Sequence, residues 1–390
     1  MKDMQNAVIT LIRAALAGEK QALDEDFDLG EAVTVAKNHG IPAILYYGAY
    51  YCGITDTEPR MEELFQYTGL SILRNQQQSY EISRIFDRFN EAQIDYMPLK
   101  GVLLGNMYPK SEMRMISDVD ILIKPAQYKK IRNILLELDF KEAGESDHEI
   151  KWVKPTLYVE LHNKLIPSYN KDYYAYFRDG WQFAKCCDGT CYSMTKEDQM
   201  IYLFTHFAKH YRDAGIGIKH LVDLWVYRKN TPDLNETYIK NELEKLRLKE
   251  FYENILCTLG VWFENKQGNP ITEMITDFIF DSTAGGTKEN AALSSTVRFS
   301  KRARLMKNIK LRKIWNTVFC PYRKMCVAYP FLKKFPVALP VMWAVRVFSK
   351  VFQKDQRTAY RQAMHQVDID SAKQHEANLN FVGLNFDFKR

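Results

Sequence analysis

The chain has 390 residues, of which 46% are hydrophobic and 26% charged, an ordinary globular composition with enough length for roughly two or three domains. Its seven cysteines are odd in number and mostly scattered, which argues against a disulfide framework and favours reduced thiols. No apolar run approaches the roughly 18 residues of a membrane span, and the N-terminus lacks the uninterrupted apolar core of a secretion signal. These features predict a cytoplasmic protein.

Residues 1–90 predict a helical N-terminal region, because apolar side chains recur there at helical spacing. The segment EAVTVAKNHGIPAILYYGAYY is interrupted at Gly40-Ile41-Pro42, which predicts the end of one helix and the start of the next. Residues 60–92 predict one or two long helices.

Residues 91–194 change to short apolar runs separated by turn residues, which predicts a small α/β domain. Strands are predicted for IDYMPLKG (94–101), ISDVDILI (116–123) and the alternating TLYVELHNKL (156–165). A short helix is predicted for VLLGNMY, and an amphipathic helix for AQYKKIRNILLELDF. The predicted fold class is therefore α+β, with a small mixed sheet embedded between helical regions.

Helical spacing returns over residues 195–280, which predict a helical domain that closes a cleft against the sheet domain. The sequence from Thr195 to Asp198 has the form of a capping box at the start of this domain. One face of the first helix is apolar: Met200, Phe204, Phe207, Ala208 and Tyr211. The segment DSTAGGTKENAALSS then predicts a linker that opens the C-terminal region, residues 281–390.

The C-terminal region contains a basic and aromatic segment, residues 290–354, with fifteen Lys and Arg residues and no Asp or Glu. A solvated helix face is the simplest interpretation, but the composition also fits a surface that meets anionic lipid headgroups or nucleic acid. We favour a peripheral position at the inner face of a membrane over nucleic acid, because no groove-reading module is recognisable. The stretch FPVALPVMWAVRVF within this segment predicts an amphipathic surface helix.

Two aspartates, Asp118 and Asp120, interrupt the apolar run MISDVDILI of the second predicted strand. Side chains at i and i+2 share a face of a strand, and two neighbouring carboxylates repel each other unless a cation lies between them. Magnesium suits such a pair when a third oxygen ligand is present, and Glu160 provides one between apolar neighbours on a later strand. The alternative is an exposed strand face with solvated charges.

The segment PLKG ends the preceding strand at Gly101. Backbone N–H groups exposed at such a turn can bind phosphate, and Lys100 adds a positive charge. Together these residues form the arrangement of two-metal nucleotidyl transfer. It consists of a glycine turn for a triphosphate, two aspartates for two Mg²⁺ ions and a third acid beside the attacking group.

Residues 94–165 resemble the polymerase-β-like nucleotidyltransferase superfamily, in which a glycine-containing turn precedes D-h-D-h on one strand and a lone acid on another. More closely, LKGVLLGNMYPKSEMRMISDVDILI, VELHNKL and THFAKHYRDAGIGIKHLVDLWVY are similar to an uncharacterised bacterial nucleotidyltransferase family marked by L-K-G, R-x-x-x-D-h-D-h-h and a helical H-x-x-x-H. The likeness covers most of the chain and extends to YPFLKKFPVALPVMWAVR. The single glycine after Lys100 departs from the Gly-Gly or Gly-Ser of the superfamily turn.

The resemblance implies that three carboxylates, Asp118, Asp120 and Glu160, are catalytic and bind the metal. It implies nucleotide-phosphate contact at Lys100 and Gly101. It also implies that Arg114 supports the loop or the phosphates, and we include the neighbouring Ser117 among the nucleotide-binding residues.

His206 and His210 are four residues apart and share a helix face. A zinc site of the HExxH type is not indicated, because the residue after His206 is a phenylalanine. A polar helix face is an equally good interpretation. If the pair is functional, it should border the cleft and contact nucleotide or acceptor together with Lys209, Lys219 and Asp223.

The sequence thus predicts a Mg²⁺-dependent enzyme that transfers a nucleoside monophosphate from an NTP to an unidentified acceptor hydroxyl. One alternative is a catalytically silent nucleotide-binding or scaffold protein, docked to a membrane-associated assembly through residues 290–354. Another is a toxin that modifies tRNA or protein by the same chemistry.

Overall fold

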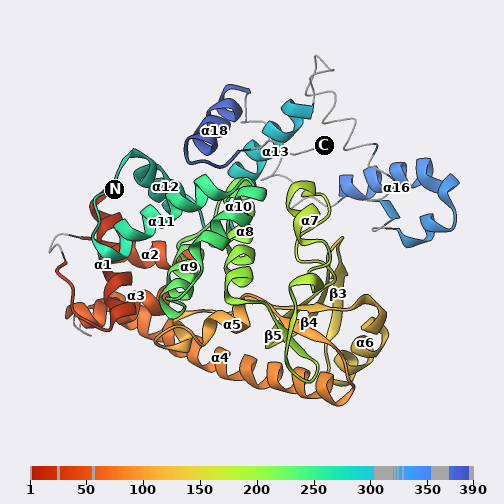
Figure 1. The fold of residues 1–390 in the computed structure, drawn as a ribbon, viewed down its shortest axis with the longest axis horizontal. Helices are drawn as coiled ribbons and strands as arrows, with labels where there is room; N and C mark the ends of the chain where they lie inside the picture. Colours follow the sequence, from red (N-terminus) through yellow and green to blue (C-terminus); the bar gives the residue numbers. More distant parts are fainter. Residues whose placement is uncertain are drawn as a thin grey trace.

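The computed structural model describes residues 2–23, 27–54, 58–302, 319, 322, 325–326, 329–352 and 369–385. Helices α8 (Lys196–Ala214) and α9 (Ile218–Asn230) lie at the centre, with the N-terminal helices on one side and the strands on the other (Figure 1). The arrangement is a mixed α/β fold in which helical segments precede and follow the strands in the chain.

The N-terminal region is helical, as predicted, and consists of α1 (Lys2–Ala17), α2 (Leu29–His39), α3 (Pro42–Cys52) and α4 (Pro59–Glu91). The predicted break is confirmed, because Gly40 takes a φ of 69° at the C-cap of α2 and Pro42 begins α3. Helices α1 and α3 pack closely, since a Cβ atom at Gly48 would lie 2.0 Å from the carbonyl oxygen of Leu11.

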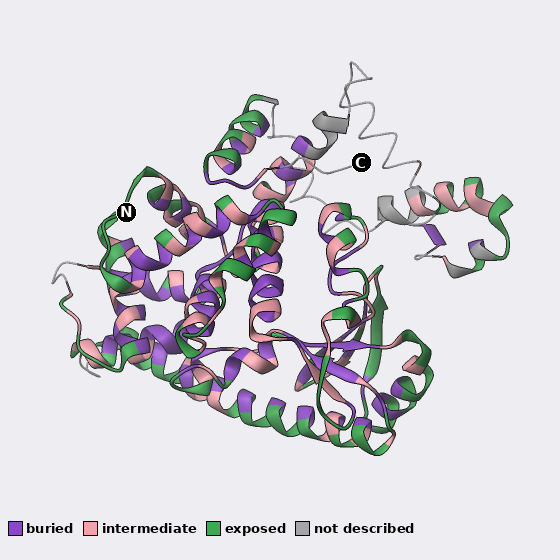
Figure 2. Cartoon of the chain, in the orientation of Figure 1, coloured by how far each residue is buried: buried purple, intermediate pink, exposed green. Residues whose placement is uncertain are grey.

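Helix α4 is one continuous helix of 33 residues that contributes to both large hydrophobic clusters of the molecule. Met61 and Leu64, near its start, pack in a cluster with the other N-terminal helices and with α8 to α12. Ile82, Ile85 and Phe89, near its end, pack in a second cluster with the strands. One side of α4 is exposed along much of its length, as Figure 2 shows.

The polar middle of α4 holds the loop that leads into the second strand. The side-chain amide of Asn75 donates to the carbonyl oxygen of Ser111 at 2.8 Å, and that of Gln78 donates to the carbonyl oxygen of Ile116 at 3.2 Å. Both side chains are buried, so these hydrogen bonds hold the loop before β2 against the interior of the protein.

A seven-stranded mixed sheet has the order β3-β4-β5-β2-β1-β7-β6. Its strands are β1 (Tyr96–Pro98), β2 (Val119–Ile123), β3 (Lys141–Glu145), β4 (Glu149–Lys154), β5 (Leu157–His162), β6 (Lys185–Asp188) and β7 (Cys191–Ser193). Strand β2 runs parallel to β5 and antiparallel to β1. The apolar side chains of the sheet pack against the end of α4 and against α6 (Tyr128–Glu137).

The three predicted strands are confirmed as β1, β2 and β5, with one correction. The ladder between β2 and β5 begins at the pair of Val119 and Val159, so Asp118 lies on the loop before β2 and not on the strand. The short segments between strands are α5 (Gly101–Gly105), α7 (Lys171–Phe177), η1 (Ser111–Met113), η2 (Pro125–Gln127) and η3 (Trp181–Phe183).

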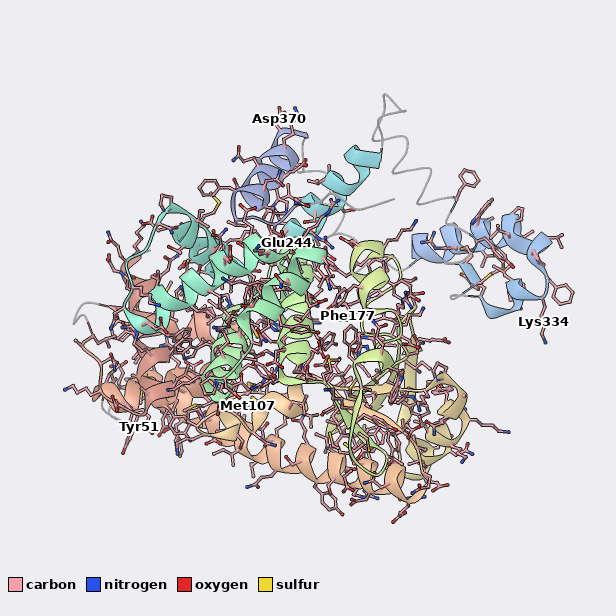
Figure 3. All side chains as sticks on the ribbon, viewed as in Figure 1. Tyr51, Met107, Phe177, Glu244, Lys334 and Asp370 are labelled. Atoms are coloured by element: carbon pink, nitrogen blue, oxygen red, sulfur yellow. The ribbon has the colours of Figure 1, made fainter. Side chains whose placement is uncertain are left out.

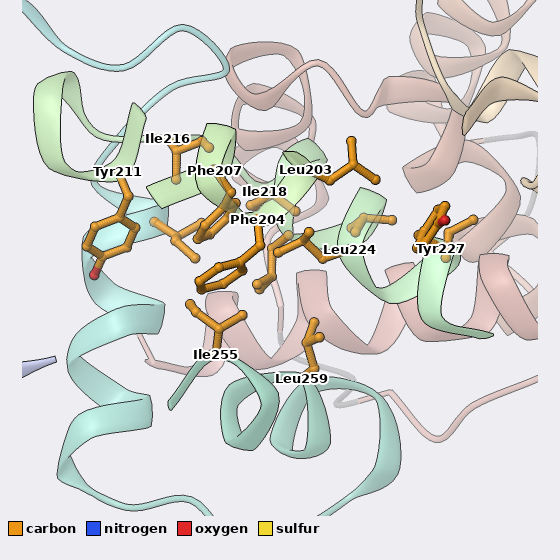
Figure 4. Close-up of a cluster of buried hydrophobic side chains, with 14 of the residues drawn as sticks. Leu203, Phe204, Phe207, Tyr211, Ile216, Ile218, Leu224, Tyr227, Ile255 and Leu259 are labelled. Carbon is orange, nitrogen blue, oxygen red and sulfur yellow. The ribbon is translucent and has the colours of Figure 1, made fainter. Parts of the chain in front are cut away.

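The helices after the sheet are α8, α9, α10 (Glu236–Lys245), α11 (Lys249–Glu264) and α12 (Pro270–Phe280). The hydroxyl oxygen of Thr195 caps α8 by accepting a hydrogen bond from the N–H group of Asp198 at 3.1 Å. The apolar face predicted for α8 is confirmed, because all five of its residues are buried. Figure 4 shows Phe204 and Phe207 packed beside Ile218 of α9 and Ile255 of α11.

Residues 288–302 form helix α13 (Lys288–Arg302), so the linker predicted for residues 281–295 is wrong from Lys288 onward. This helix packs against α8 and against α18 (Ile369–Phe381), and the side chains of Ala292 and Val297 are buried there. The hydroxyl group of Ser294 donates to the carbonyl oxygen of Arg212. Tertiary contacts therefore stabilise a helix that the small and polar composition does not indicate.

Much of the basic segment predicted for residues 290–354, including residues 303–318, lies outside the described residues. Its described C-terminal part forms η4 (Pro330–Lys333), η5 (Pro336–Ala338) and α16 (Leu339–Phe352), which confirms the predicted surface helix from Leu339 onward. This part projects from the rest of the molecule near Lys334 (Figure 3). Among the helices described, none has both the length and the apolarity needed to cross a membrane.

Three buried histidines make stability dependent on pH. Burial lowers the pKa of His39 to about 4, of His220 to about 3 and of His375 to about 4, all below the ordinary 6.5. The unfolded chain therefore binds more protons below about pH 6.5, and stability present at neutral pH is lost as the pH falls, by up to about 1.4 kcal/mol per histidine and pH unit. We expect a lower melting temperature at about pH 5 than at about pH 7.5.

His39 offers the control, because its Nδ1 atom accepts a hydrogen bond from the N–H group of Ile218 at 3.2 Å. A His39→Gln variant retains an acceptor but cannot be protonated, so its melting temperature should change less with pH than that of the wild type. Equal melting temperatures for the wild type at the two pH values would contradict this account.

Candidate active site

A cavity of about 540 Å³ lies between strands β2, β4 and β5, with their adjoining loops, and helices α8 and α9. Every predicted site residue lines it: Lys100, Gly101, Arg114, Ser117, Asp118, Asp120, Glu160, His206, His210 and Lys219. Most carboxylates of the cavity, including Asp118, Asp120 and Glu160, come from the sheet side, which we call the acidic wall although Lys100 and Lys151 also lie there. Lys209 and Lys219 come from α8 and α9, which we call the basic wall.

Asp120 and Glu160 are direct neighbours on the parallel strands β2 and β5. Asp120 Oδ1 accepts hydrogen bonds from Lys100 Nζ at 3.1 Å and from His162 Nε2 at 2.8 Å. Burial by itself raises the pKa of the Asp120 carboxyl, but the charge of Lys100 and the hydrogen bond from His162 outweigh it, so this pKa lies far below its ordinary value. Asp120 is thus a buried anion with two positively charged or donating neighbours.

Glu160 contacts a second cation. Its Oε1 atom accepts a hydrogen bond from Lys151 Nζ at 2.6 Å, and its Oε2 atom lies 3.7 Å from His162 Nε2. Burial raises the pKa of the Glu160 carboxyl, but the hydrogen bonds from His162 and Lys151 lower it below its ordinary value. Lys151 also contacts Glu149 at 3.1 Å, so its ammonium group lies between two carboxylates.

Asp118 is placed differently from the strand-face position predicted for it. It is half-buried on the loop before β2, where the hydroxyl group of Ser117 donates to its Oδ1 atom at 2.5 Å. Within the part of the chain that is described, Asp120, Glu160 and His162 form a compact group with ligand atoms within 4.8 Å of one another, and Asp118 is not in that group. Asp118 lines the same cavity.

The acidic wall fits a magnesium ion. Asp120 and Glu160 present hard carboxylate oxygens to one point, which is the ligand type that Mg²⁺ prefers, and Asp118 adds a third carboxylate at the same cavity. The ammonium groups of Lys100 and Lys151 contact these carboxylates, so a metal would share or replace those contacts. Asp120 and Glu160, with Asp118 on the same cavity, are the carboxylates that could hold a metal.

Arg114, which lines the cavity, forms a buried ion pair. Its Nε and Nη2 atoms donate to the two carboxylate oxygens of Asp223 at 2.8 and 3.0 Å, and the hydroxyl group of Tyr108 donates to the same carboxylate at 2.7 Å. The Nη1 atom of Arg114 would lie 3.3 Å from a Cβ atom at Gly101, so only a glycine fits beside it without adjustment. The guanidinium group therefore supports the Lys100-Gly101 turn, at which Lys100 takes a φ of 37°.

The wall formed by α8 and α9 carries lysines that lack anionic partners. Within the described part of the chain, neither Lys209 nor Lys219 has a carboxylate oxygen within 4.0 Å, although both line the cavity. Burial lowers the pKa of Lys209 to about 8 and also lowers that of Lys219. His206 and His210 lie beside them with their Nε2 atoms 3.1 Å apart, and burial keeps both pKa values well below 6.5.

A family model described as "Uncharacterised nucleotidyltransferase" matches residues 25–264, which is more than half of the chain and includes every residue of the cavity named so far. The chain belongs to this nucleotidyltransferase family. The comparison with curated proteins and the comparison with solved structures each found no match. The predicted membership of an uncharacterised nucleotidyltransferase family is confirmed. Membership of this family makes the protein an enzyme that acts on an NTP.

Several side chains of the nucleotidyltransferase site were missed from the sequence, among them His162 and Lys151, which contact the carboxylates. The signal for His162 was present, because it follows Glu160 by two residues on an alternating strand and must share its face. No comparable signal existed for Lys151, because β4 was not predicted and its pairing with β5 is what places Lys151 beside Glu160.

The unpaired lysines allow a test of the basic wall of the nucleotidyltransferase. A Lys209→Met substitution should weaken the binding of inorganic tripolyphosphate by about tenfold, because one charge-assisted contact is lost from a desolvated position. The measurement is isothermal titration calorimetry at about pH 7. Lys249→Met is the matched control, since Lys249 pairs with Glu244 on the outer surface at 3.2 Å; an equal loss in both variants would contradict a phosphate-binding role.

Proposed function

We propose that this protein is a Mg²⁺-dependent nucleotidyltransferase of the polymerase-β-like type, which transfers a nucleoside monophosphate from an NTP to an acceptor hydroxyl. The observation that carries the proposal is the in-register pair of Asp120 and Glu160, which faces a wall of unpaired lysines across one cavity. A metal–triphosphate complex has both kinds of charge, and this cavity provides a complementary surface for each.

The acidic wall would hold the metal through Asp118, Asp120 and Glu160. Bound at these residues, two Mg²⁺ ions would supply Lewis-acid polarisation of the α-phosphate and would neutralise charge on the leaving pyrophosphate. Lys100 and His162 keep Asp120 ionised and fix its orientation through their hydrogen bonds.

The basic wall would bind the phosphates. Lys209 and Lys219 line the cavity and have no ion pair with any described carboxylate, so a polyphosphate would gain two attractive charges there without displacing one of those carboxylates. Lys100 contributes from the opposite side, and Arg114 acts indirectly, because its pair with Asp223 fixes the turn that carries Lys100.

The ionised Glu160 would accept the proton of the acceptor hydroxyl. The acceptor oxygen forms a bond with the α-phosphorus, the bond between the α-phosphorus and the bridging oxygen breaks, and pyrophosphate leaves with that oxygen. The lysines of α8 and α9, which line the same cavity, would hold the β- and γ-phosphates until release.

We further propose that the chain functions in four parts: residues 1–90, the catalytic residues 91–194, the cleft-closing residues 195–280 and the C-terminal residues 281–390. Residues 195–280 supply the lysine-bearing wall described above. Peripheral docking of the last part to an anionic membrane is supported by exposed apolar side chains on and before α16, with Val337 at 87% and Val341 at 63% exposure, in a segment without acids.

The decisive experiment is to incubate the protein with each of the four α-³²P-labelled NTPs and Mg²⁺, with and without candidate acceptors such as tRNA and bacterial lysate proteins. We expect label to be transferred from one NTP and the transfer to be abolished by EDTA. Calorimetry with the same nucleotides measures binding independently of turnover. An absence of binding for all four Mg-NTPs at millimolar concentrations would overturn the proposal.

A further inference from the structure

Beside the acidic wall lies a second group of metal-ligand side chains, His148, Glu149 and His162. Their ligand atoms lie within 4.8 Å of one another. The strand order β4-β5-β2 separates this group from Asp120, because Glu149 pairs with His162 across β4 and β5, whereas Asp120 lies across β5 on β2. The group thus extends from His162 on β5 toward β4, whereas Asp120 lies on the opposite neighbour of β5, strand β2.

His162 has one ring nitrogen in use and one without a partner. Its Nε2 atom is 2.8 Å from Asp120 Oδ1, whereas its Nδ1 atom is buried and, among the described residues, has no hydrogen-bond partner. The residue is only 2% exposed, so water does not reach this nitrogen freely. The two nitrogens of an imidazole ring point in divergent directions, so Nδ1 does not face the Asp120 oxygen that Nε2 contacts, and the residue paired with His162 on β4 is Glu149.

This pattern is the one that metal-binding histidines show. A ligating histidine usually donates the N–H of its second nitrogen to a carboxylate, which fixes the tautomer and leaves the first nitrogen as a lone-pair donor. Asp120 accepts such a bond from His162 Nε2. His148 has a comparable arrangement, because its Nδ1 atom contacts Ser146 Oγ at 3.2 Å and its Nε2 atom lies 3.0 Å from Glu149 Oε2.

We infer that His148, Glu149 and His162 form a binding site for a transition-metal dication, separate from the magnesium site of the proposed function. Two imidazoles and one carboxylate favour Zn²⁺, Co²⁺ or Mn²⁺, whereas Mg²⁺ prefers a set of oxygen ligands. Lys151 is the cation that now contacts Glu149, at 3.1 Å, and its side chain is 48% exposed, so it can move into solvent when a metal binds. All three side chains line the cavity, so a metal can reach them from it.

The two sites share His162 as a link. A metal on its Nδ1 atom holds the proton on Nε2, and this proton is the one donated to Asp120. An occupied site therefore fixes the orientation of the Asp120 carboxylate. Metal binding to His148, Glu149 and His162 can be measured without nucleotide, so its outcome is independent of whether the protein transfers nucleotides.

The test is a titration of the tag-free, full-length protein with Co²⁺ in the absence of nucleotide, followed by visible absorption, and with Zn²⁺ by calorimetry. We expect one site with a nitrogen–oxygen spectrum. His148→Ala and Glu149→Gln, made separately, should each weaken binding at least about tenfold. His210→Ala is the matched control, because His206 and His210 form another histidine pair in the same cavity.

Four results would overturn the inference. The first is an absence of cobalt absorption in the wild type, and the second is unchanged affinity in a folded His148→Ala or Glu149→Gln variant, with folding checked by thermal unfolding. The third is a loss of the site in His210→Ala alone. The fourth is a sulfur-to-cobalt charge-transfer band as the only signal, which would place the metal at the exposed Cys186 and Cys187.

Discussion

Replacement of Asp120 by asparagine is expected to abolish nucleotidyl transfer while the protein stays folded. Asparagine has the same shape and still accepts hydrogen bonds from Lys100 and His162, but it lacks the charge that would hold the metal. Metal ions contribute several kcal/mol to a transition state of this kind, so the rate should fall by about a thousandfold or more. The measurement is label transfer from α-³²P-NTP at saturating Mg²⁺.

The matched control for this variant is Asp95→Asn. Asp95 also forms an ion pair within the sheet region, with Lys124 at 2.6 Å, but it does not line the cavity. We expect this variant to retain full activity. Comparable turnover in Asp120→Asn and the wild type would exclude Asp120 from the chemistry, and a parallel loss in Asp95→Asn would show that the effect is general to the sheet.

Replacement of Asp223 by alanine is expected to have the largest effect on stability. The change leaves the guanidinium group of Arg114 and the hydroxyl group of Tyr108 buried without their carboxylate. The side chains of both Arg114 and Asp223 are only 7% exposed, so water cannot replace the lost contacts. Breaking a buried pair of this kind typically costs about 3–5 kcal/mol, which urea denaturation will measure as a lower free energy of unfolding.

Two further variants show whether this cost comes from the orphaned charge. Glu273→Ala removes the exposed pair with Lys2, whose side chains are 59% and 71% exposed, and should cost no more than about 1 kcal/mol. The double substitution Arg114→Met with Asp223→Leu removes both charges and should recover much of the loss. If Asp223→Ala is as mild as Glu273→Ala, the pair does not stabilise the fold.

The sequence predicted the helices and three strands because their periodicity is local. The break at Gly40 and Pro42, the long helix after residue 59 and the strands around Asp120 and Glu160 all follow from the pattern of a few consecutive residues. The hairpins of the sheet were missed for the opposite reason. Strand β3 has the sequence KEAGE with every residue exposed, so only its pairing with β4 makes it a strand.

The sequence predicted which residues line the candidate site, but it did not predict which of them contact one another. Acids at spaced positions on strands can be read from alternation, as Asp120 and Glu160 were. The pairings that give these residues their electrostatics join positions far apart in the chain, 42 residues for Asp120 with His162 and 109 for Arg114 with Asp223. Such pairings depend on how the strands and helices pack, which no local pattern specifies.

Helix α4 contacts both hydrophobic clusters, and its 33 residues span roughly 50 Å at 1.5 Å per residue. Because α4 is continuous, a single element joins the cluster beneath the strands to the cluster of α8 to α12, and a change at one end of it is transmitted to the other. Asn75 and Gln78 lie in its middle and hold the loop that carries Asp118. Loss-of-function variants should therefore be found along the inner side of α4, among residues that never contact substrate.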